Sequence, residues 1–194
     1  MKSRSTPKDF IDQIIEFEAE SMLADLVMSP ALMDMMFVSD EKRRKAAVDF
    51  VASILRQHFD GKHLHVAVSH GDNELYGYAM LFTDPGQETK YLHKIYVFED
   101  FRGQGIGQSL LNSVIADGGP TALICPPELE RFYEKKGFKF AQEFRVPDSE
   151  EFRLSRNLYS GLIFMGNSSG SMRAPVFMLN DVDIRRIKSL TLNA

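Results

Sequence analysis

The sequence is poor in the features that would build a disulfide framework, a membrane span or a nucleic-acid surface. Its single cysteine, Cys125, excludes an intramolecular disulfide and a cysteine-based zinc site, which favours a reduced, cytoplasmic protein. No run approaches the roughly 18 apolar residues of a transmembrane helix, and the opening "MKSRSTPKDF" lacks the apolar stretch of a secretory signal. A net charge of −4 gives no reason to expect nucleic acid. We therefore expect neither a membrane nor a nucleic-acid partner.

The overall composition of the chain is typical of a globular protein with a sizeable core. The chain has 194 residues, of which 44% are hydrophobic and 26% charged. Apolar residues recur at helical spacing over 8–29 and, with Ser39 as N-cap, over 39–61. Alternating patterns separated by turn residues then predict an antiparallel meander of three strands, at 63–70, 74–82 and 90–98.

The pattern changes after this meander. It predicts, in order, a helix, a short buried strand, a helix and a strand, at 106–117, 121–125, 126–137 and 138–146. A strand–helix–strand unit within an otherwise antiparallel arrangement predicts an α+β fold, with a mixed, mostly antiparallel central sheet flanked by helices.

We expect a single domain over 1–194, with a core at about 8–146. Residues 147–194 would complete the sheet through strands near 158–165 and 175–179, before a short turn of helix or a frayed end.

Three glycines at alternating positions stand between a predicted strand and a predicted helix in "YVFEDFRGQGIGQSLL", residues 96–111. A dinucleotide-binding turn has the spacing G-x-G-x-x-G, and here the third glycine comes one residue early. A P-loop requires Lys after its last glycine, and here Gln108 follows instead. The remaining interpretation is R-x-x-G-x-G, beginning at Arg102. Its amides would point into one concavity at a helix N-terminus, which suits a pyrophosphate.

At this point the chain resembles the GNAT superfamily of N-acetyltransferases. The acetyl-CoA motif of that superfamily is similar to "LHKIYVFEDFRGQGIGQSLL", and its F-Y-E-x-x-G-F helix is similar to "LERFYEKKGFKF". The order of elements also fits, over about 20–146. Weaker similarity to the puromycin-acetyltransferase-like branch lies in "MMFVSDEKRRKAAVDF", "YLHKIYV", "IADGGPTALI" and "FYEKKGF". That branch often carries Trp in its final strand, where this chain has Phe177.

The resemblance implies an α+β GNAT fold and an enzyme that moves an acetyl group from the cosubstrate acetyl-CoA to a primary amine of a small molecule, without a metal. It implies direct attack in a ternary complex. It assigns cofactor binding to Ile95, Tyr96, Val97, Arg102, Gly103, Gln104, Gly105, Ile106, Gly107 and Gln108. One departure concerns Pro126, because many members carry at that position an Asn that contacts the cofactor arm.

Tyr133 and His93 are the expected catalytic residues. Tyr133 matches the superfamily tyrosine beside the cofactor sulfur, where a phenol can donate to the leaving thiolate. The alternative is that Tyr133 only packs in the core as an aromatic residue, since Phe132 stands next to it. His93 lies two residues before Ile95, on the same strand face by the period of two, where members often carry a carboxylate. Histidine can accept a proton near neutral pH, but a half-exposed strand histidine without a catalytic task is the alternative.

Other residues and segments leave further alternatives open. Glu99 and Asp100 could replace His93 as base but better suit the connector, and Cys125 is expected to be inert packing. Segment 147–174 could fold as a lid over the acceptor, contact a second subunit of a homodimer, or form a disordered bulge. Competing functions are a non-catalytic acyl-CoA-binding module and acetylation of a protein or peptide amine.

Overall fold

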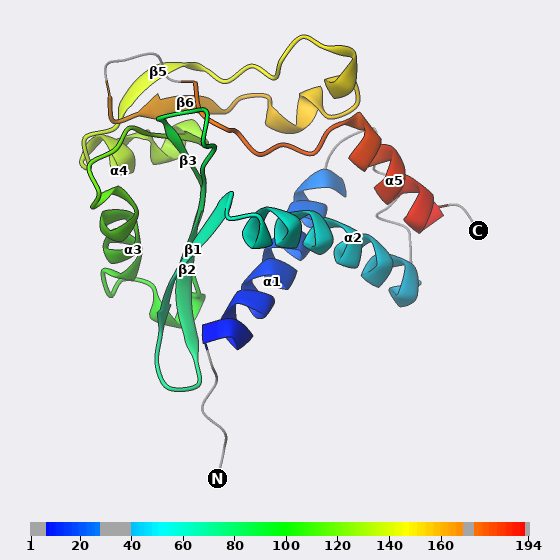
Figure 1. Cartoon of the computed structure of the whole chain (residues 1–194), viewed down its shortest axis with the longest axis horizontal. Coiled ribbons are helices and arrows are strands. Elements are labelled where there is room, and N and C mark those ends of the chain that lie inside the picture. The colour runs from blue at the N-terminus through cyan, green and yellow to red at the C-terminus, as the bar shows by residue number, and fades with distance from the viewer. Residues whose placement is uncertain (1–6, 28–39, 169–172, 193–194) are drawn as a thin grey trace. The chain divides into compact units, whose positions relative to one another are not determined.

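A computed structural model describes residues 7–27, 40–168 and 173–192 of the chain (Figure 1). The helices are α1 (Pro7–Val27), α2 (Glu41–Asp60), α3 (Ile106–Ile115), α4 (Glu130–Glu134) and α5 (Asp181–Leu192). The strands are β1 (Leu64–His70), β2 (Leu75–Phe82), β3 (Lys90–Val97), β4 (Thr121–Cys125), β5 (Lys139–Glu143) and β6 (Ile163–Gly166). Short 3₁₀ turns lie at Glu99–Phe101, Pro127–Leu129, Glu150–Phe152 and Arg156–Tyr159.

The chain divides into two compact units. The first consists of Met1–Asp12, His58–Glu143 and Gly161–Phe177, and the second of Gln13–Gln57, Phe144–Ser160 and Met178–Ala194. The expectation of one domain over 1–194 stays a prediction.

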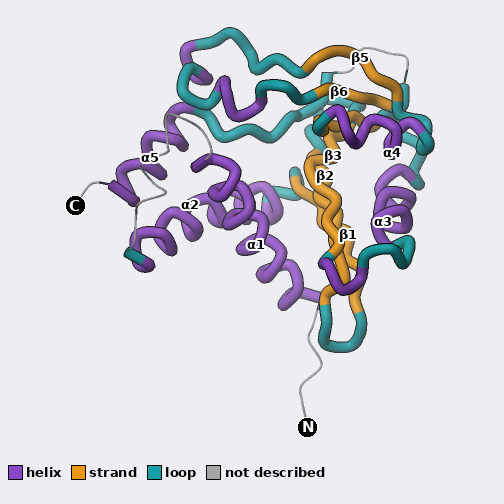
Figure 2. The backbone as a smooth tube through the Cα atoms, turned by 180° about the vertical axis from the view of Figure 1, so that it is seen from behind, coloured by secondary structure: helices purple, strands orange, loops and turns teal. Residues whose placement is uncertain are grey.

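The first unit holds the whole sheet, whose strand order is β1-β2-β3-β4-β6-β5. Only β3 and β4 pair in parallel, and every other neighbouring pair is antiparallel. Helix α3 connects β3 to β4 and covers one face of β1, β2 and β3 (Figures 1 and 2). The predicted α+β fold with a mixed, mostly antiparallel sheet is confirmed.

The described residues beyond 147 join the sheet through one strand rather than two. The strand expected near 158–165 is the shorter β6, which lies between β4 and β5. The strand expected at 175–179 is wrong, because residues 173–180 carry no strand. Pro175 lacks an amide hydrogen for a ladder, and the Leu179 amide donates instead to the Tyr159 hydroxyl oxygen at 3.2 Å.

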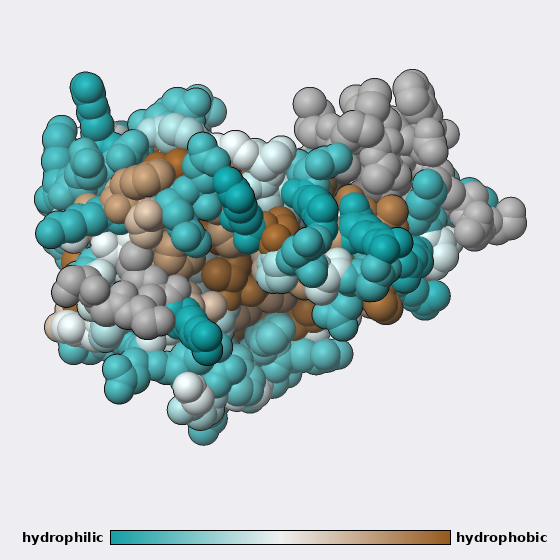
Figure 3. All heavy atoms as spheres, turned by 90° about the horizontal axis from the view of Figure 1, so that it is seen from above, coloured by the Kyte–Doolittle hydropathy of each residue, from teal (hydrophilic) through white to brown (hydrophobic). Residues whose placement is uncertain are grey.

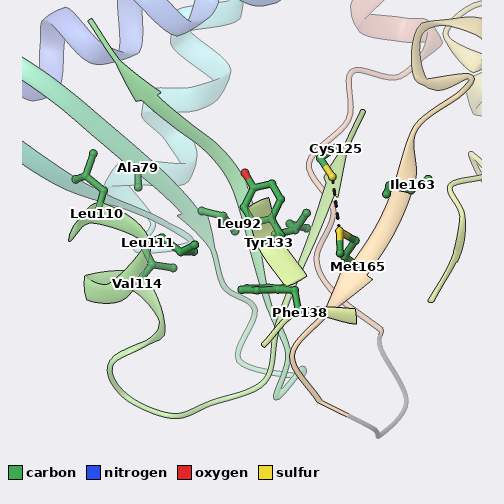
Figure 4. Packing of buried hydrophobic residues seen from close by; sticks show 11 residues of the cluster. Ala79, Leu92, Leu110, Leu111, Val114, Cys125, Tyr133, Phe138, Ile163 and Met165 are labelled. Carbon is green, nitrogen blue, oxygen red and sulfur yellow. Dashed lines mark hydrogen bonds between the residues drawn. The ribbon is translucent and has the colours of Figure 1, made fainter. Parts of the chain in front are cut away.

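The core of the first unit lies between the sheet and the two helices α3 and α4. Leu110, Leu111 and Val114 recur at helical spacing, so one face of α3 is buried. They pack with alternate strand residues and with aromatic residues of and after α4. The whole cluster, shown in Figure 4, is Ala79, Leu92, Leu110, Leu111, Val114, Leu123, Cys125, Tyr133, Phe138, Ile163 and Met165.

Helix starts in the second unit are capped by side-chain oxygens. Ser39, the expected cap of α2, lies outside the described residues, and the Asp40 carboxylate accepts hydrogen bonds from the amides of Lys42 and Arg43 at 2.9 and 3.4 Å. Asn180 caps α5 by accepting from the amide of Val182 at 2.8 Å. With this cap, the expected short turn near the C-terminus extends to the 12 residues of α5.

Candidate functional site

Strands β3 and β4 pair for three residues and then separate. Their ladder joins Lys90–Leu92 to Thr121–Leu123. Beyond it, β4 continues against β6 to Cys125, whereas β3 continues against β2 to Val97. The ladder between β3 and β4 therefore stops before Ile95, within the described segment 40–168. An extended ligand can hydrogen-bond to a strand edge of this kind, as an added strand does.

The turn that follows β3 contains three glycines, and its backbone conformation requires glycine at two of them. Gly103 and Gly105 have φ values of +78° and +79°, in the left-handed region that a Cβ makes unfavourable. A Cβ at either position would meet no atom within 4 Å, so backbone conformation and not space is the constraint. Gly107 has no positive φ, and a Cβ there would lie 3.5 Å from Val97 Cγ2, an ordinary contact.

Helix α3 begins without a side-chain cap. The Ser109 amide is the first to donate along the helix, to the Gly105 carbonyl oxygen at 3.0 Å. The preceding amides of Ile106, Gly107 and Gln108 are N-terminal donors that the helix itself cannot satisfy, and no side chain in the described segments caps them. Together with the positive end of the helix dipole, these donors can bind an anion.

Arg102 holds this turn in place. Its Nε donates to the Val97 carbonyl oxygen at 3.1 Å, and its guanidinium carbon lies 6.0 Å from the centre of the Tyr96 ring. Glu99 and Asp100 are exposed in the 3₁₀ turn of the connector, as their position in the sequence suggests. The side chain of Arg102 thus closes the turn while leaving its positive charge at the surface.

Gly77 is a positioning residue that the sequence pattern does not reveal. It pairs with Val97 across β2 and β3. A Cβ at Gly77 would lie 2.5 Å from the Tyr96 carbonyl oxygen and 3.4 Å from Leu110 Cδ1 of α3. Only glycine therefore lets β2, the end of β3 and α3 approach as closely as they do.

Tyr133 lies beside the point where β3 and β4 separate. Figure 4 shows its ring between the strand that carries Leu92 and the strand that carries Cys125, with the hydroxyl directed toward the side where these strands diverge. The side chain is 8% exposed, and burial, with a smaller contribution from the Cys125 thiol, raises the pKa of the phenol to about 12. No residue in the described part of the chain hydrogen-bonds to this hydroxyl. The phenol is therefore buried, protonated and able to donate.

Cys125 has the properties of a packing residue. It is 3% exposed, and its Sγ lies 3.8 Å from the sulfur of Met165. Burial, followed by the carboxylates of Glu130 and Glu128, raises the pKa of its thiol to about 11. A thiol that stays protonated is a poor nucleophile, which agrees with the expected packing role.

The expectation that His93 and Ile95 share a strand face is wrong. Leu92 pairs with Leu81 and Lys94 pairs with Met80, so His93 is the extra residue of a β-bulge. A bulge breaks the period of two. Ile95 packs against the cluster that contains Tyr133, whereas the His93 ring faces the opposite side of the sheet.

On that opposite face His93 belongs to a cluster of aromatic rings. Its ring centre lies 5.6 Å from those of Phe82 and Phe177, edge-on to both. These two phenyl rings stack on each other at 4.8 Å, and the His58 ring lies 5.4 Å from each. Burial, followed by His63, lowers the pKa of His58. Phe177, which stands where the puromycin-acetyltransferase-like branch often has Trp, is thus part of the surroundings of His93.

The structure places several of the predicted residues around one buried cluster. Ile95, Val97 and Ile106 pack against the cluster that contains Tyr133, and the glycine turn lies between Val97 and the start of α3. His93 lies on the other face of the sheet. No three His, Cys, Asp or Glu side chains gather as a metal site in the segments 7–27, 40–168 and 173–192. None of the described helices is both long and apolar enough to cross a membrane.

Comparison with known proteins gives one family and several solved structures. A model of the acetyltransferase (GNAT) domain matches residues 60–140. No curated protein matches the chain. A GNAT-family putative acetyltransferase from Desulfovibrio desulfuricans is 20% identical, with 69% of this chain and 90% of that chain covered and a TM-score of 0.47.

Two further solved structures have the same sequence identity to this chain. A GNAT acetyltransferase from Elizabethkingia anophelis with acetyl-CoA bound is 20% identical, with 59% of this chain and 80% of that chain covered and a TM-score of 0.42. ElaA of Escherichia coli is also 20% identical, with 54% of this chain and 68% of that chain covered and a TM-score of 0.43.

Proposed function

We propose that the chain, whose residues 60–140 match the acetyltransferase (GNAT) domain, transfers the acetyl group of acetyl-CoA to the primary amine of a small molecule by direct attack in a ternary complex. The observation that supports this most is the early end of the β3–β4 ladder next to an uncapped helix N-terminus. The two features lie on consecutive segments of the chain, so a single extended ligand can contact both.

In this proposal the donor lies along the turn and then along β3. Its pyrophosphate accepts hydrogen bonds from the amides of 103–108, which the left-handed Gly103 and Gly105 expose. The charge of Arg102 adds attraction at the same place. The pantetheine arm then pairs with the backbone of Ile95 and Val97, on the edge of β3 that β4 no longer occupies.

The reaction forms a C–N bond and breaks a C–S bond. The amine nitrogen attacks the thioester carbonyl carbon, and a backbone amide near Ile95 or Tyr96 donates to the developing oxyanion. The CoA thiolate then leaves, and the phenol of Tyr133 donates a hydrogen bond to it. With a phenol pKa of about 12 and a thiol pKa near 8.5, complete proton transfer from Tyr133 is uphill by about 5 kcal/mol. Tyr133 therefore acts as a hydrogen-bond donor, and the thiolate takes its proton afterwards from solvent.

The proton lost by the amine goes to His93. Because His93 and Tyr133 lie on opposite faces of the sheet, the acceptor amine approaches from the His93 face while the thioester is held from the Tyr133 face. The two reactants meet where β3 and β4 separate. The aromatic surroundings of His93 exclude water from the proton transfer.

The substitution Tyr133→Phe tests the role of the phenol. We expect kcat to fall about 100-fold, with the dissociation constant of acetyl-CoA unchanged, in an assay of free thiol release with a panel of small amines. Tyr159→Phe is the matched control, because the pKa of that buried phenol is also about 12 and it lies in the other unit. Equal turnover in the two variants would contradict the assignment.

The base is tested in the same assay with His93→Ala, which we expect to lower turnover and to flatten its pH profile near neutrality. His65→Ala is the control, since the side chain of that exposed β1 histidine hydrogen-bonds to Thr83. A wild-type protein that acetylates peptide amines but no small amine in the panel would overturn the proposed acceptor class. Binding of acetyl-CoA without acetylation of any amine would overturn the proposed transfer.

A further inference from the structure

One residue of β2 contacts both ends of the connector between β3 and the glycine turn. The carbonyl oxygen of Tyr76 accepts a hydrogen bond from the Phe98 amide at 3.0 Å, where the connector begins. The ring centre of Tyr76 lies 4.4 Å from that of Phe101, where the connector ends. Figures 1 and 2 show the 3₁₀ turn of this connector, Glu99–Phe101, beside the β1–β2 hairpin. The connector is thus held at both ends by a single residue.

A β-bulge gives Tyr76 this position. Across β1 and β2, Ser69 pairs with Gly77 and His70 pairs with Leu75. Tyr76 stands between these two pairs and is the extra residue of the bulge. A bulge redirects a side chain from the regular alternation of a strand. The Tyr76 ring can therefore lie against the connector.

Gly71 provides the space that the Tyr76 hydroxyl needs. A Cβ at Gly71 would lie 2.3 Å from the Tyr76 hydroxyl oxygen and 3.0 Å from the ring carbon that carries it. The Tyr76 ring would have to shift to relieve this overlap. Gly71 has no positive φ, so its backbone conformation does not itself require glycine. A methyl group at this position would therefore act on the connector through Tyr76.

The position of the connector decides where the turn amides point. Arg102 and the glycine turn follow Phe101 directly in the chain. The amides of Phe101 and Arg102 donate to the carbonyl oxygens of Phe98 and Glu99 at 3.0 and 3.1 Å, so these residues form one closed turn. A displacement of the Phe101 ring would therefore be passed on to the amides of 103–108.

The contact between Tyr76 and Phe101 is internal to the first unit. Figure 3 views the molecule from the side on which β5 and β6 lie in Figure 1, and apolar side chains gather there among hydrophilic ones. The turn of the β1–β2 hairpin lies away from β5 and β6 in Figures 1 and 2. Tyr76 and Phe101 are both half-buried, and each ring covers part of the other.

We propose that Tyr76 is a positioning residue for the donor. It holds the connector so that the amides of 103–108 converge on the pyrophosphate, and Gly71 makes room for its hydroxyl. Tyr76 acts through Phe101 and does not touch the ligand. This inference rests on the proposed binding of acetyl-CoA.

Titrations of the full chain with acetyl-CoA and with S-acetylpantetheine test the proposal. S-acetylpantetheine carries the arm and the acetyl group but no pyrophosphate, so its binding does not depend on the turn amides. In Tyr76→Ala, the dissociation constant of acetyl-CoA should rise about tenfold because the aromatic contact is lost. The dissociation constant of S-acetylpantetheine should stay unchanged. Isothermal titration calorimetry measures the first ligand, and ligand-observed nuclear magnetic resonance the second.

Two further changes show whether the ring and its space are what matter. Tyr76→Phe keeps the ring and should retain the affinity for acetyl-CoA. Gly71→Ala should raise the dissociation constant about fivefold, because the methyl group displaces the Tyr76 ring. Gly71→Ala combined with Tyr76→Phe should recover most of the affinity, because the oxygen in closest conflict is gone.

Phe144→Ala is the matched control, since it removes an aromatic contact of 6.2 Å with Tyr159 in the second unit. It should leave both dissociation constants unchanged. A wild type that does not bind acetyl-CoA would overturn the proposed function itself. A wild type that binds it, with Tyr76→Ala binding it equally well, would overturn this inference alone. So would equal losses for acetyl-CoA and S-acetylpantetheine, because the effect would then not act on the pyrophosphate.

Discussion

The glycine turn at 103–108 and the segment 144–160 are both irregular backbone, but different interactions hold them. In the turn, the bonds from Arg102 to Val97 and from Ser109 to Gly105 span only a few residues. In the segment, the Leu154 amide donates to Asp181 Oδ1 at 2.9 Å, across 27 positions. Irregular backbone can therefore be interpreted from sequence when its hydrogen-bond partners are local, and not when they are distant.

The distant bonds also bear on the expected role of 147–174. Both ends of segment 144–160 lie in the second unit, together with α5. Leu154 and Ser155 bond to Asp181, and the Tyr159 hydroxyl accepts from the Leu179 amide. In addition, the described part of 147–174 contains two 3₁₀ turns and strand β6. A lid over the acceptor and a contact with a second subunit stay predictions for this segment.

Removing the distant anchor should have the largest effect. Asp181 is 1% exposed, so in Asp181→Ala the amides of Leu154 and Ser155 lose a buried acceptor. We expect the free energy of unfolding to fall by about 2–3 kcal/mol, measured by urea denaturation, with the affinity for acetyl-CoA unchanged. Asp148→Ala removes an exposed pair with Arg156 and should change stability by less than about 0.5 kcal/mol. Similar losses in both variants would show that Asp181 is not an anchor.

Straining the local turn should lower stability and also weaken the binding of acetyl-CoA. Gly105→Ala places a Cβ on a residue with φ of +79°, which costs roughly 1–2 kcal/mol. If the turn relaxes to relieve this strain, its amides no longer converge, and the dissociation constant of acetyl-CoA should rise about tenfold. Isothermal titration calorimetry measures the change.

Gly118→Ala provides the matched control, because Gly118 also has a left-handed φ, of +70°, with open space around it. It should lose similar stability and keep full affinity for acetyl-CoA. Equal losses of affinity in the two variants would mean that the glycine turn has no special part in binding.

Alkaline pH should have the smallest effect, and it compares the buried phenol of Tyr133 in α4 with the buried phenol of Tyr159 in segment 144–160. The pKa values of Tyr133 and Tyr159 are about 12, above the ordinary 10.0, so the folded state holds both protons more tightly than the unfolded state. This stabilisation is complete below about pH 10 and is lost as the pH rises toward about 12.

Each Tyr→Phe variant should lose its share of this alkaline decrease, about 1 kcal/mol at about pH 11. Urea denaturation at neutral and alkaline pH measures it. If Tyr133→Phe and the wild type show the same decrease, the phenol is not buried as described.

The sequence could predict the parts of the site that local constraints create. Gly103 and Gly105 are needed by their own φ values, and their spacing indicates the turn. Tyr133 lies in a short motif, in and directly after α4, whose resemblance to the superfamily motif indicates it. The bulge at His93 depends on the register with β2, and no residue in β3 signals it. Gly77 matters because of the distant Leu110 and Tyr96. These features became visible only when separate segments were placed side by side.

The same limit applies to the order of strands. The pattern predicts a strand near 158–165, but not that this strand, β6, inserts between β4 and β5. Insertion is decided by which buried side chains meet, here Met165 with Cys125 and Phe138, and not by the propensity of the segment.

The central claim is that the donor binds to the turn amides and then along β3. Amide hydrogen exchange, resolved by nuclear magnetic resonance with and without acetyl-CoA, tests it most directly. We expect slower exchange at 103–108 and at Ile95 and Val97, with no change over 144–160 or in α5. Slower exchange over 144–160, with the amides of 103–108 unchanged, would contradict it.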